Sequence, residues 1–102
     1  MHFVVHALDK PDAVERRLSH LAAHRAYLDT APDAHGLTVL LSGPLTIGDQ
    51  ETMTGSFFLL EAPHLEAVEE MIAQDPLRLA NVWETVCINK VLIRQNKMGG
   101  SG

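Results

Sequence analysis

The sequence is poor in cysteine. Its single cysteine, Cys87, has no partner for an internal disulfide and cannot form a thiolate metal cluster alone. A reactive thiol needs exposure and cationic neighbours, whereas Cys87 lies in an apolar run, so we expect it to be a buried structural residue. The chain therefore excludes a disulfide framework and does not indicate thiol redox chemistry.

Positive charge is also scarce, with 8 Lys and Arg against 13 Asp and Glu and a formal net charge of −5 at pH 7. Nucleic-acid binding depends mainly on Lys and Arg, so this balance argues against a nucleic-acid partner. No apolar stretch approaches the roughly 20 residues of a membrane span, and the N-terminus lacks the pattern of a signal peptide. We therefore expect a soluble, cytoplasmic protein in a reducing compartment, with no membrane partner.

The length of 102 residues suits one domain with one core. A domain of this size buries about two-thirds of the surface of its unfolded chain, so it folds alone with little stability to spare. We assign the domain to residues 1–95. Residues 96–102 are expected to be a flexible or artificial tail.

Hydrophobic periodicity and turn residues divide the domain into strands and helices. The first helix, from Asp12 to about Thr30, carries one apolar stripe and is expected to end before Pro32, because a residue preceding proline is pushed out of the α region. A second helix opens at Pro63 and stops at Asp75. The apolar stripe of the first helix consists of Val14, Leu18, Leu21 and Leu28. Strands are predicted over residues 3–8, 37–41, 55–62 and about 84–93, with a loop over 44–54 and a short turn or helix over 77–81.

The resulting order, β-α-β-β-α-β, is the signature of a ferredoxin-like α+β sandwich. Two helices cover only one face of a four-stranded sheet, yet the first three strands are apolar on both faces. The uncovered face would form a larger apolar patch than monomers normally expose. We therefore predict a homodimer packed sheet on sheet, able to assemble into a higher oligomer.

The first helix contains the candidates for acid–base chemistry. His24 lies at the edge of the apolar stripe, close to Arg17 and four residues after His20. A half-buried histidine titrates near neutrality, as a general acid or base must. A border histidine that only makes a hydrogen bond fits the same spacing.

Asp75 ends the second helix, immediately before Pro76. Acids in this position are often simple turn formers. A carboxylate at a helix C-terminus meets the unfavourable end of the helix dipole, however, so we expect Asp75 to have another reason to be there. A histidine of the first helix would provide one, because the carboxylate would fix the tautomer of the imidazole and raise its basicity.

Two further patterns could contact a ligand. Ser42-Gly43-Pro44 is either a plain turn or a ligand contact, in which Gly43 allows close approach to the backbone and the Ser42 hydroxyl orients the ligand. His20 and His24 form an H-x-x-x-H pair. This pair lacks the glutamate of H-E-x-x-H and any clear third ligand, so we predict no metal site.

Together these features resemble the YCII-like family of small dimeric α+β barrel proteins, over residues 1 to about 95. The resemblance rests on the N-terminal strand, Arg17 and His24 within R-L-x-x-x-x-x-H, Ser42-Gly43-Pro44, Gly55 opening the third strand, and Ala73-Gln74-Asp75-Pro76. It implies a His24–Asp75 dyad in a pocket beside the sheet. It also implies a fold shared with muconolactone isomerases and with a dehydrochlorinase that acts on a chlorinated hydroxymuconate. The sequence departs from the family pattern after Pro76, where Leu77-Arg78-Leu79-Ala80-Asn81 replaces an aromatic residue and small residues.

We predict a small-molecule acid–base enzyme of the lyase or isomerase type that needs no metal or organic cofactor. His24 would move the proton and Asp75 would orient His24. Arg17 would hold an anionic group of the substrate, while Ser42 and the Gly43 backbone would line the wall. One alternative is a dimeric module that binds a small ligand without catalysis. Another is haem or metal binding through His24, as in other dimeric α+β barrels.

Overall fold

Four antiparallel strands form one sheet in the order β2-β3-β1-β4 in the computed structural model, which describes residues 1–48 and 51–98. The elements are β1 (His2–Asp9), α1 (Val14–Ala34), β2 (Thr38–Thr46), β3 (Met53–Glu61), α2 (Leu65–Ala73), α3 (Pro76–Leu79) and β4 (Trp83–Val91). This confirms the predicted β-α-β-β-α-β order of a ferredoxin-like α+β sandwich, with α3 as a short addition before the last strand. No helix in the described part of the chain is long and apolar enough to cross a membrane.

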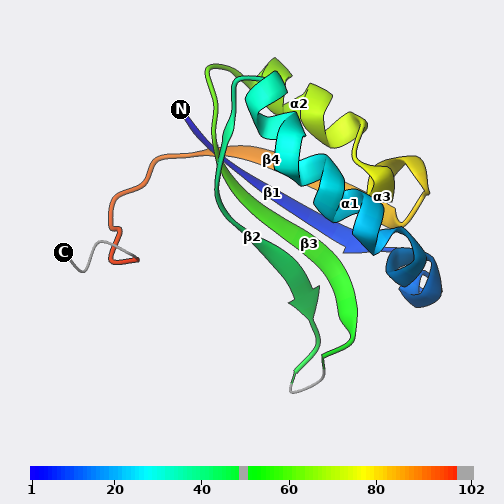
Figure 1. Ribbon diagram of the computed structural model, residues 1–102. Helices are drawn as coiled ribbons and strands as arrows, with labels where there is room; N and C mark the ends of the chain where they lie inside the picture. The colour runs from blue at the N-terminus through cyan, green and yellow to red at the C-terminus, as the bar shows by residue number, and fades with distance from the viewer. Residues whose placement is uncertain (49–50, 99–102) are drawn as a thin grey trace.

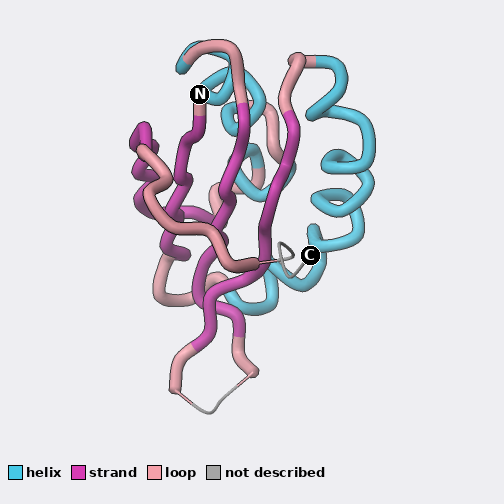
Figure 2. The backbone as a smooth tube through the Cα atoms, turned by 90° about the vertical axis from the view of Figure 1, so that its left-hand side faces the viewer, coloured by secondary structure: helices cyan, strands magenta, loops and turns pink. Residues whose placement is uncertain are grey.

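The helices lie on one face of the sheet, and the core fills the space between them (Figure 1). Side chains alternate along β1, where Phe3 and Val5 are buried beneath the helices and His6 is exposed on the other face. Figure 2 shows the strands side by side from another direction, with one helix behind them and another to their right. The largest fully buried side chains include Trp83, Phe58, Leu60 and Met71.

Helix α1 presents a different face to the core from the one that its apolar stripe predicts. Val14 is 41% exposed and Leu18 is 54% exposed, whereas Arg17 and Ala31 are buried. The stripe prediction was therefore wrong for the N-terminal half of the helix. The physical reason is that this half of α1 contacts buried polar partners of the sheet rather than an apolar surface.

The end of α1 also differs from its prediction, because Pro32 lies inside the last turn and the helix continues to Ala34. Proline costs the helix one backbone hydrogen bond. Ala31 and Pro32 are both buried, and the Pro32 carbonyl accepts a 2.7 Å hydrogen bond from the Leu37 backbone N–H. The burial of Ala31 and Pro32 and the hydrogen bond from Leu37 offset the helical hydrogen bond that Pro32 cannot make.

Strand β2 is longer than predicted and contains Ser42-Gly43-Pro44, which was expected to end it. Ser42 pairs with Phe58, Gly43 with Phe57 and Pro44 with Ser56. Proline is tolerated here because β2 is an edge strand of the sheet. The predicted loop over residues 44–54 is correspondingly shorter, and residues 49–50 lie outside the described part of the chain.

Gly55 is fixed by close packing between strands. A Cβ atom at this position would clash with the backbone carbonyl oxygen of Ala7 on β1 and would lie 2.9 Å from Leu45 Cδ1 on β2. The Ala7 carbonyl belongs to the backbone of β1 and cannot move away without disturbing the sheet. Only glycine fits here, and the residue after it, Ser56, is thereby held deep under α1.

The face of the sheet without helices carries apolar side chains, as its sequence pattern predicted. Val4, Phe57 and Leu59 are half-buried there, and together with Leu41 they border a groove with the C-terminal segment 92–98. Residues 99–102 of the expected tail lie outside the described residues.

Cys87 is exposed on this same face, opposite His6. The prediction that Cys87 is buried was therefore wrong for the single chain. Alternation along β4 points this side chain away from the helices, and an apolar run does not reveal which face each residue occupies.

Candidate functional site

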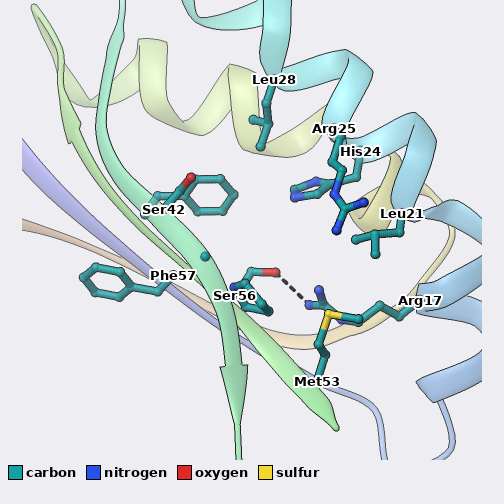
Figure 3. Close-up of a pocket in the computed structure, with 12 residues that line it drawn as sticks. Arg17, Leu21, His24, Arg25, Leu28, Ser42, Met53, Ser56 and Phe57 are labelled. Carbon is teal, nitrogen blue, oxygen red and sulfur yellow. Dashed lines mark hydrogen bonds between the residues drawn. The ribbon is translucent and has the colours of Figure 1, made fainter. Parts of the chain in front are cut away.

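A cavity of about 160 Å³ lies between α1 and strands β2 and β3 (Figure 3). An apolar cavity of about 150 Å³ holds benzene, so this one fits a molecule the size of a single ring. Apolar side chains form most of its wall, and polar groups from α1, β2 and β3 point into it. The lining residues are Arg17, Leu21, His24, Arg25, Leu28, Ser42, Gly43, Pro44, Met53, Ser56, Phe57 and Phe58.

His24 of α1 and Asp75, at the junction of α2 and α3, meet beside this cavity. The Nδ1 atom of His24 lies 2.9 Å from each carboxylate oxygen of Asp75. The Asp75 side chain is completely buried and that of His24 is 12% exposed. An ionised carboxylate can only accept hydrogen bonds, so Nδ1 carries the hydrogen and donates it. The other ring nitrogen, Nε2, is then the basic nitrogen of the neutral imidazole.

Asp75 is held in place by the backbone around it. Its Oδ1 also accepts a 2.8 Å hydrogen bond from the Leu77 backbone N–H, and its extended backbone makes it the N-cap of α3. The expectation that Asp75 does not serve helix stability was therefore wrong. The residue follows α2 but caps the next helix, which begins at Pro76 and could not be distinguished from a turn in the sequence.

Aromatic rings fix the orientation of His24 from the sheet side. The rings of His24 and Phe58 pack edge to face, with centroids 6.2 Å apart and planes at 70°. Phe58 packs in the same way on Trp83, with centroids 6.5 Å apart. The imidazole is thus held by a carboxylate at Nδ1 and by a buried aromatic pair beneath it.

Tyr27, one turn further along α1, ties this helix to α2. Its hydroxyl donates a 2.6 Å hydrogen bond to the backbone carbonyl of Met71. Burial raises the pKa of Tyr27 above its usual value of 10.0, and the negative charge of Asp75 raises this pKa further. Tyr27 therefore acts as a neutral donor next to the histidine–aspartate pair.

Arg17 lies at the opposite end of the cavity, and its Nε and Nη2 groups are hydrogen-bonded to the sheet. Its Nε donates to Asp9 Oδ2 at 2.7 Å and its Nη2 to Asp9 Oδ1 at 3.0 Å. The same Nη2 donates to Ser56 Oγ at 2.7 Å (Figure 3). Both side chains of the ion pair are buried, at 2% and 6% exposure. Arg17 lines the cavity, but Asp9 balances its charge, so its role in holding an anionic substrate group stays a prediction.

Ser42 and Gly43 reach the cavity from β2. In the sheet register Ser42 lies opposite Phe58, which is buried under the helices, and Gly43 lies opposite Phe57. Ser42 therefore faces the helix side, while Gly43 contributes its backbone. Their contact with a ligand stays a prediction.

Two polar residues of the lining, Arg25 and Ser56, were not predicted from the sequence. Arg25 follows His24 in the chain and is exposed at the cavity, and Ser56 follows Gly55 and is 3% exposed. Neither belongs to a motif. Only the requirement for glycine at position 55, which implies close packing there, could have drawn attention to Ser56.

The other histidines are placed apart from this site. His20 Nδ1 lies 2.9 Å from the Arg16 backbone carbonyl oxygen, whereas His24 Nδ1 faces Asp75. His64 caps α2 by accepting from the Ala67 N–H, and His6 is on the uncovered face. Across residues 1–48 and 51–98, no group of three or more His, Cys, Asp or Glu side chains is arranged to hold a metal ion.

Comparison with solved structures identifies an enzyme of similar fold. The structure of 5-chloro-2-hydroxyhydroquinone dehydrochlorinase (TftG) from Burkholderia phenoliruptrix AC1100, in complex with 2,5-dihydroxybenzoquinone, superimposes with a TM-score of 0.77 at 28% identity, over 90% of this chain and 94% of that one. Its named substrate is a chlorinated hydroxyhydroquinone, which corrects the chlorinated hydroxymuconate expected for a dehydrochlorinase relative. A dimeric ferredoxin-like protein of unknown function from Jannaschia sp. CCS1 has a TM-score of 0.50 at 14% identity, covers 90% of this chain and 98% of its own, and shares the fold alone.

Sequence comparison gives the family. Protein YciI of Escherichia coli O6:H1 is 36% identical over 93 residues, which are 86% of this chain and 93% of the relative. The family described as the YCII-related domain matches residues 1–91. The chain therefore belongs to the YCII-related domain family, as the resemblance in its motifs predicted.

Proposed function

We propose that this protein is a small-molecule acid–base enzyme of the lyase or isomerase type, in which His24 transfers the proton. The observation that supports this most strongly is the 2.9 Å contact of His24 Nδ1 with the buried carboxylate of Asp75 beside a cavity of ring size. The carboxylate fixes the tautomer, so that Nε2 is the nitrogen available to a molecule in the cavity.

The chemistry follows from this arrangement. Nε2 removes a proton from a carbon next to a carbonyl group, such as the keto tautomer of a phenol, and the electron pair of the broken C–H bond moves onto the carbonyl oxygen. Return of the proton to a different carbon gives an isomerisation. In an elimination, the pair instead returns from the oxygen to form a carbon–carbon double bond, and a leaving group on the next carbon departs with the electrons of its own bond. Neither route requires a metal or an organic cofactor.

The related dehydrochlorinase supports a reaction of this class. Its name describes an elimination, and the ligand in its complex is a single six-membered ring. The cavity of about 160 Å³ in this chain suits a ring of similar size. We propose a small cyclic or carboxylated molecule as the substrate.

We also propose that the functional unit is a homodimer packed through the uncovered sheet face. Val4, Phe57 and Leu59 on this face are apolar and only half-buried in the single chain. Sedimentation at micromolar concentration should give a dimer for the wild type and a monomer for Leu59→Arg, with unchanged circular dichroism. A wild-type monomer at that concentration would refute the dimer.

The catalytic proposal is tested by proton exchange and by leaving-group release. Small cyclic ketones, phenols and 5-chloro-2-hydroxyhydroquinone are incubated with the protein in D₂O, and NMR follows exchange at carbon while an electrode follows chloride. We expect exchange or chloride release that is lost by a factor of about 10²–10⁴ in His24→Gln and retained in the matched control His20→Gln. A substrate that His24→Gln converts at the wild-type rate would overturn the role of His24. Ligands that bind in the cavity without any turnover would indicate the non-catalytic binding module instead.

A further inference from the structure

We propose that Ser56 and Arg25 together form the receptor for a negatively charged oxygen of the substrate. This inference rests on the proposed function, because it concerns the molecule on which His24 acts. It identifies the substrate class as a small ring that carries an ionised oxygen, such as a phenolate, an enolate or a carboxylate.

The hydroxyl group of Ser56 is fixed as a hydrogen-bond donor. A serine hydroxyl has two acceptor lone pairs and one hydrogen to donate. Ser56 Oγ accepts from Arg17 Nη2 at 2.7 Å and from Trp83 Nε1 at 3.2 Å. Guanidinium and indole N–H groups can only donate, so both lone pairs are in use and neither neighbour can take the hydroxyl hydrogen.

That hydrogen has no acceptor in the described part of the protein, although Ser56 is 3% exposed and lines the cavity. Figure 3 shows the Ser56 oxygen beside Arg17, on the side of the strands that faces α1. A buried donor without a partner costs free energy until an acceptor arrives. An acceptor oxygen of a ligand in the cavity is the partner that this site lacks.

Arg25 supplies a positive charge to the cavity, whereas an aspartate lies against each of the other two basic residues there, Arg17 and His24. Asp9 balances the charge of Arg17, and Asp75 faces His24. Arg25 lines the same cavity and makes no ion pair within residues 1–48 and 51–98. In Figure 3 its guanidinium points from α1 into the space between His24 and Arg17. One positive charge therefore faces a wall that is otherwise mostly apolar.

These two donors also suit the proposed reaction. When His24 removes a proton from carbon, the electron pair moves onto an oxygen, and negative charge grows there. Donors already aimed at that oxygen stabilise the charge without having to reorganise. Arg17 acts here as a positioning residue, because it holds one lone pair of Ser56 and so directs the hydroxyl hydrogen.

The test uses three single-ring probes: benzoate, benzamide and benzylammonium. Their dissociation constants are measured by NMR titration for the wild type, Arg25→Gln and the control Arg78→Gln, whose exposed arginine on α3 does not line the cavity. We expect the wild type to bind benzoate most tightly, benzamide more weakly and benzylammonium most weakly. Arg25→Gln should weaken benzoate about ten- to hundredfold and benzamide less than twofold, and Arg78→Gln should change neither.

Two results would overturn the receptor: benzylammonium or benzamide binding as tightly as benzoate, or an unchanged benzoate affinity in Arg25→Gln. Ser56→Ala, measured only if its circular dichroism and thermal transition show an intact fold, should weaken benzoate and benzamide by similar factors. The probes need no turnover, so the two proposals fail separately. Anion-selective binding without any proton exchange would refute the proposal of an enzyme and leave the proposed anion receptor intact. His24-dependent exchange without any preference for anionic probes would refute the receptor and leave the enzyme proposal intact.

Discussion

Helix α1 carries two buried side-chain pairs, each with an aspartate, that differ in which hydrogen-bonding groups they leave free. At its N-terminal end, Arg17 is joined to Asp9 by two hydrogen bonds, at 2.7 and 3.0 Å. Two turns later, His24 meets Asp75 through Nδ1 alone, at 2.9 Å. Both pairs are shielded from solvent, and both connect α1 to a different part of the chain.

The difference lies in the group that each aspartate binds. A guanidinium carries a permanent charge, and Asp9 and Ser56 engage most of the Arg17 group, so this pair holds α1 on the sheet. An imidazole has only two nitrogens. When Asp75 takes one of them, the other remains for proton transfer. The same kind of contact thus serves as an anchor at one end of the helix and as a reactive group at the other.

The largest effect is expected from breaking the anchor. Arg17→Met leaves the buried carboxylate of Asp9 without its partner, and such a loss costs about 3–5 kcal/mol of unfolding free energy. Urea denaturation measures it. The control Arg25→Met, on the same helix but exposed, should stay within about 0.5 kcal/mol of the wild type. A loss below about 1 kcal/mol for Arg17→Met would show that the pair is not an anchor.

At the reactive end, Asp75→Asn should mainly affect activity. The amide keeps the size of the side chain and an oxygen for the Leu77 N–H, but it removes the charge that fixes the His24 tautomer. We expect His24-dependent proton exchange to slow by a factor of about 10²–10⁴ while the protein stays folded. An exchange rate within twofold of the wild type would show that Asp75 plays no part in proton transfer by His24.

A smaller effect is expected at Tyr27, which connects α1 to α2 near the same pair. Tyr27→Phe removes the 2.6 Å hydrogen bond to the Met71 carbonyl and should cost about 0.5–1.5 kcal/mol of unfolding free energy. The mutant should also change how stability depends on pH. Urea denaturation of both proteins at a series of pH values measures each effect.

The sign of the pH effect follows from the raised pKa of Tyr27. Because the folded state holds the phenol proton more strongly than the unfolded state, the contribution is fully present below about pH 10 and is lost as the pH rises through the raised pKa. Stability above about pH 10 should therefore fall more steeply in the wild type than in Tyr27→Phe. Parallel curves would contradict the raised pKa.

The sequence predicted the order of elements well, because glycine, proline and apolar runs mark the turns and strands directly. It failed where tertiary partners decide the outcome. The stripe containing Val14 and Leu18 faces solvent because Arg17 takes the core side of α1 through Asp9, a residue on another element. Pro32 remains helical because its surroundings bury it.

The candidate site shows the same limit. His24 and Asp75 could be chosen as candidates from their positions near helix borders and from the family resemblance. Ser56 could not, because its importance depends on two donors, Arg17 and Trp83, that reach it from distant parts of the chain. Arg25 stands out as a candidate anion-binding residue only because Asp9 balances the charge of Arg17, a contact between two elements that the sequence does not reveal.

The tautomer of His24 tests the contrast between the two pairs most directly. Long-range ¹H–¹⁵N correlation spectra, recorded at a pH where the imidazole rings are neutral, distinguish protonated from unprotonated ring nitrogens. Hydrogen bonding to Asp75 predicts a protonated Nδ1 and an unprotonated Nε2 for His24 in the wild type, and loss of this preference in Asp75→Asn. A protonated Nε2 in the wild type, or identical spectra for His24 in the two proteins, would contradict the account.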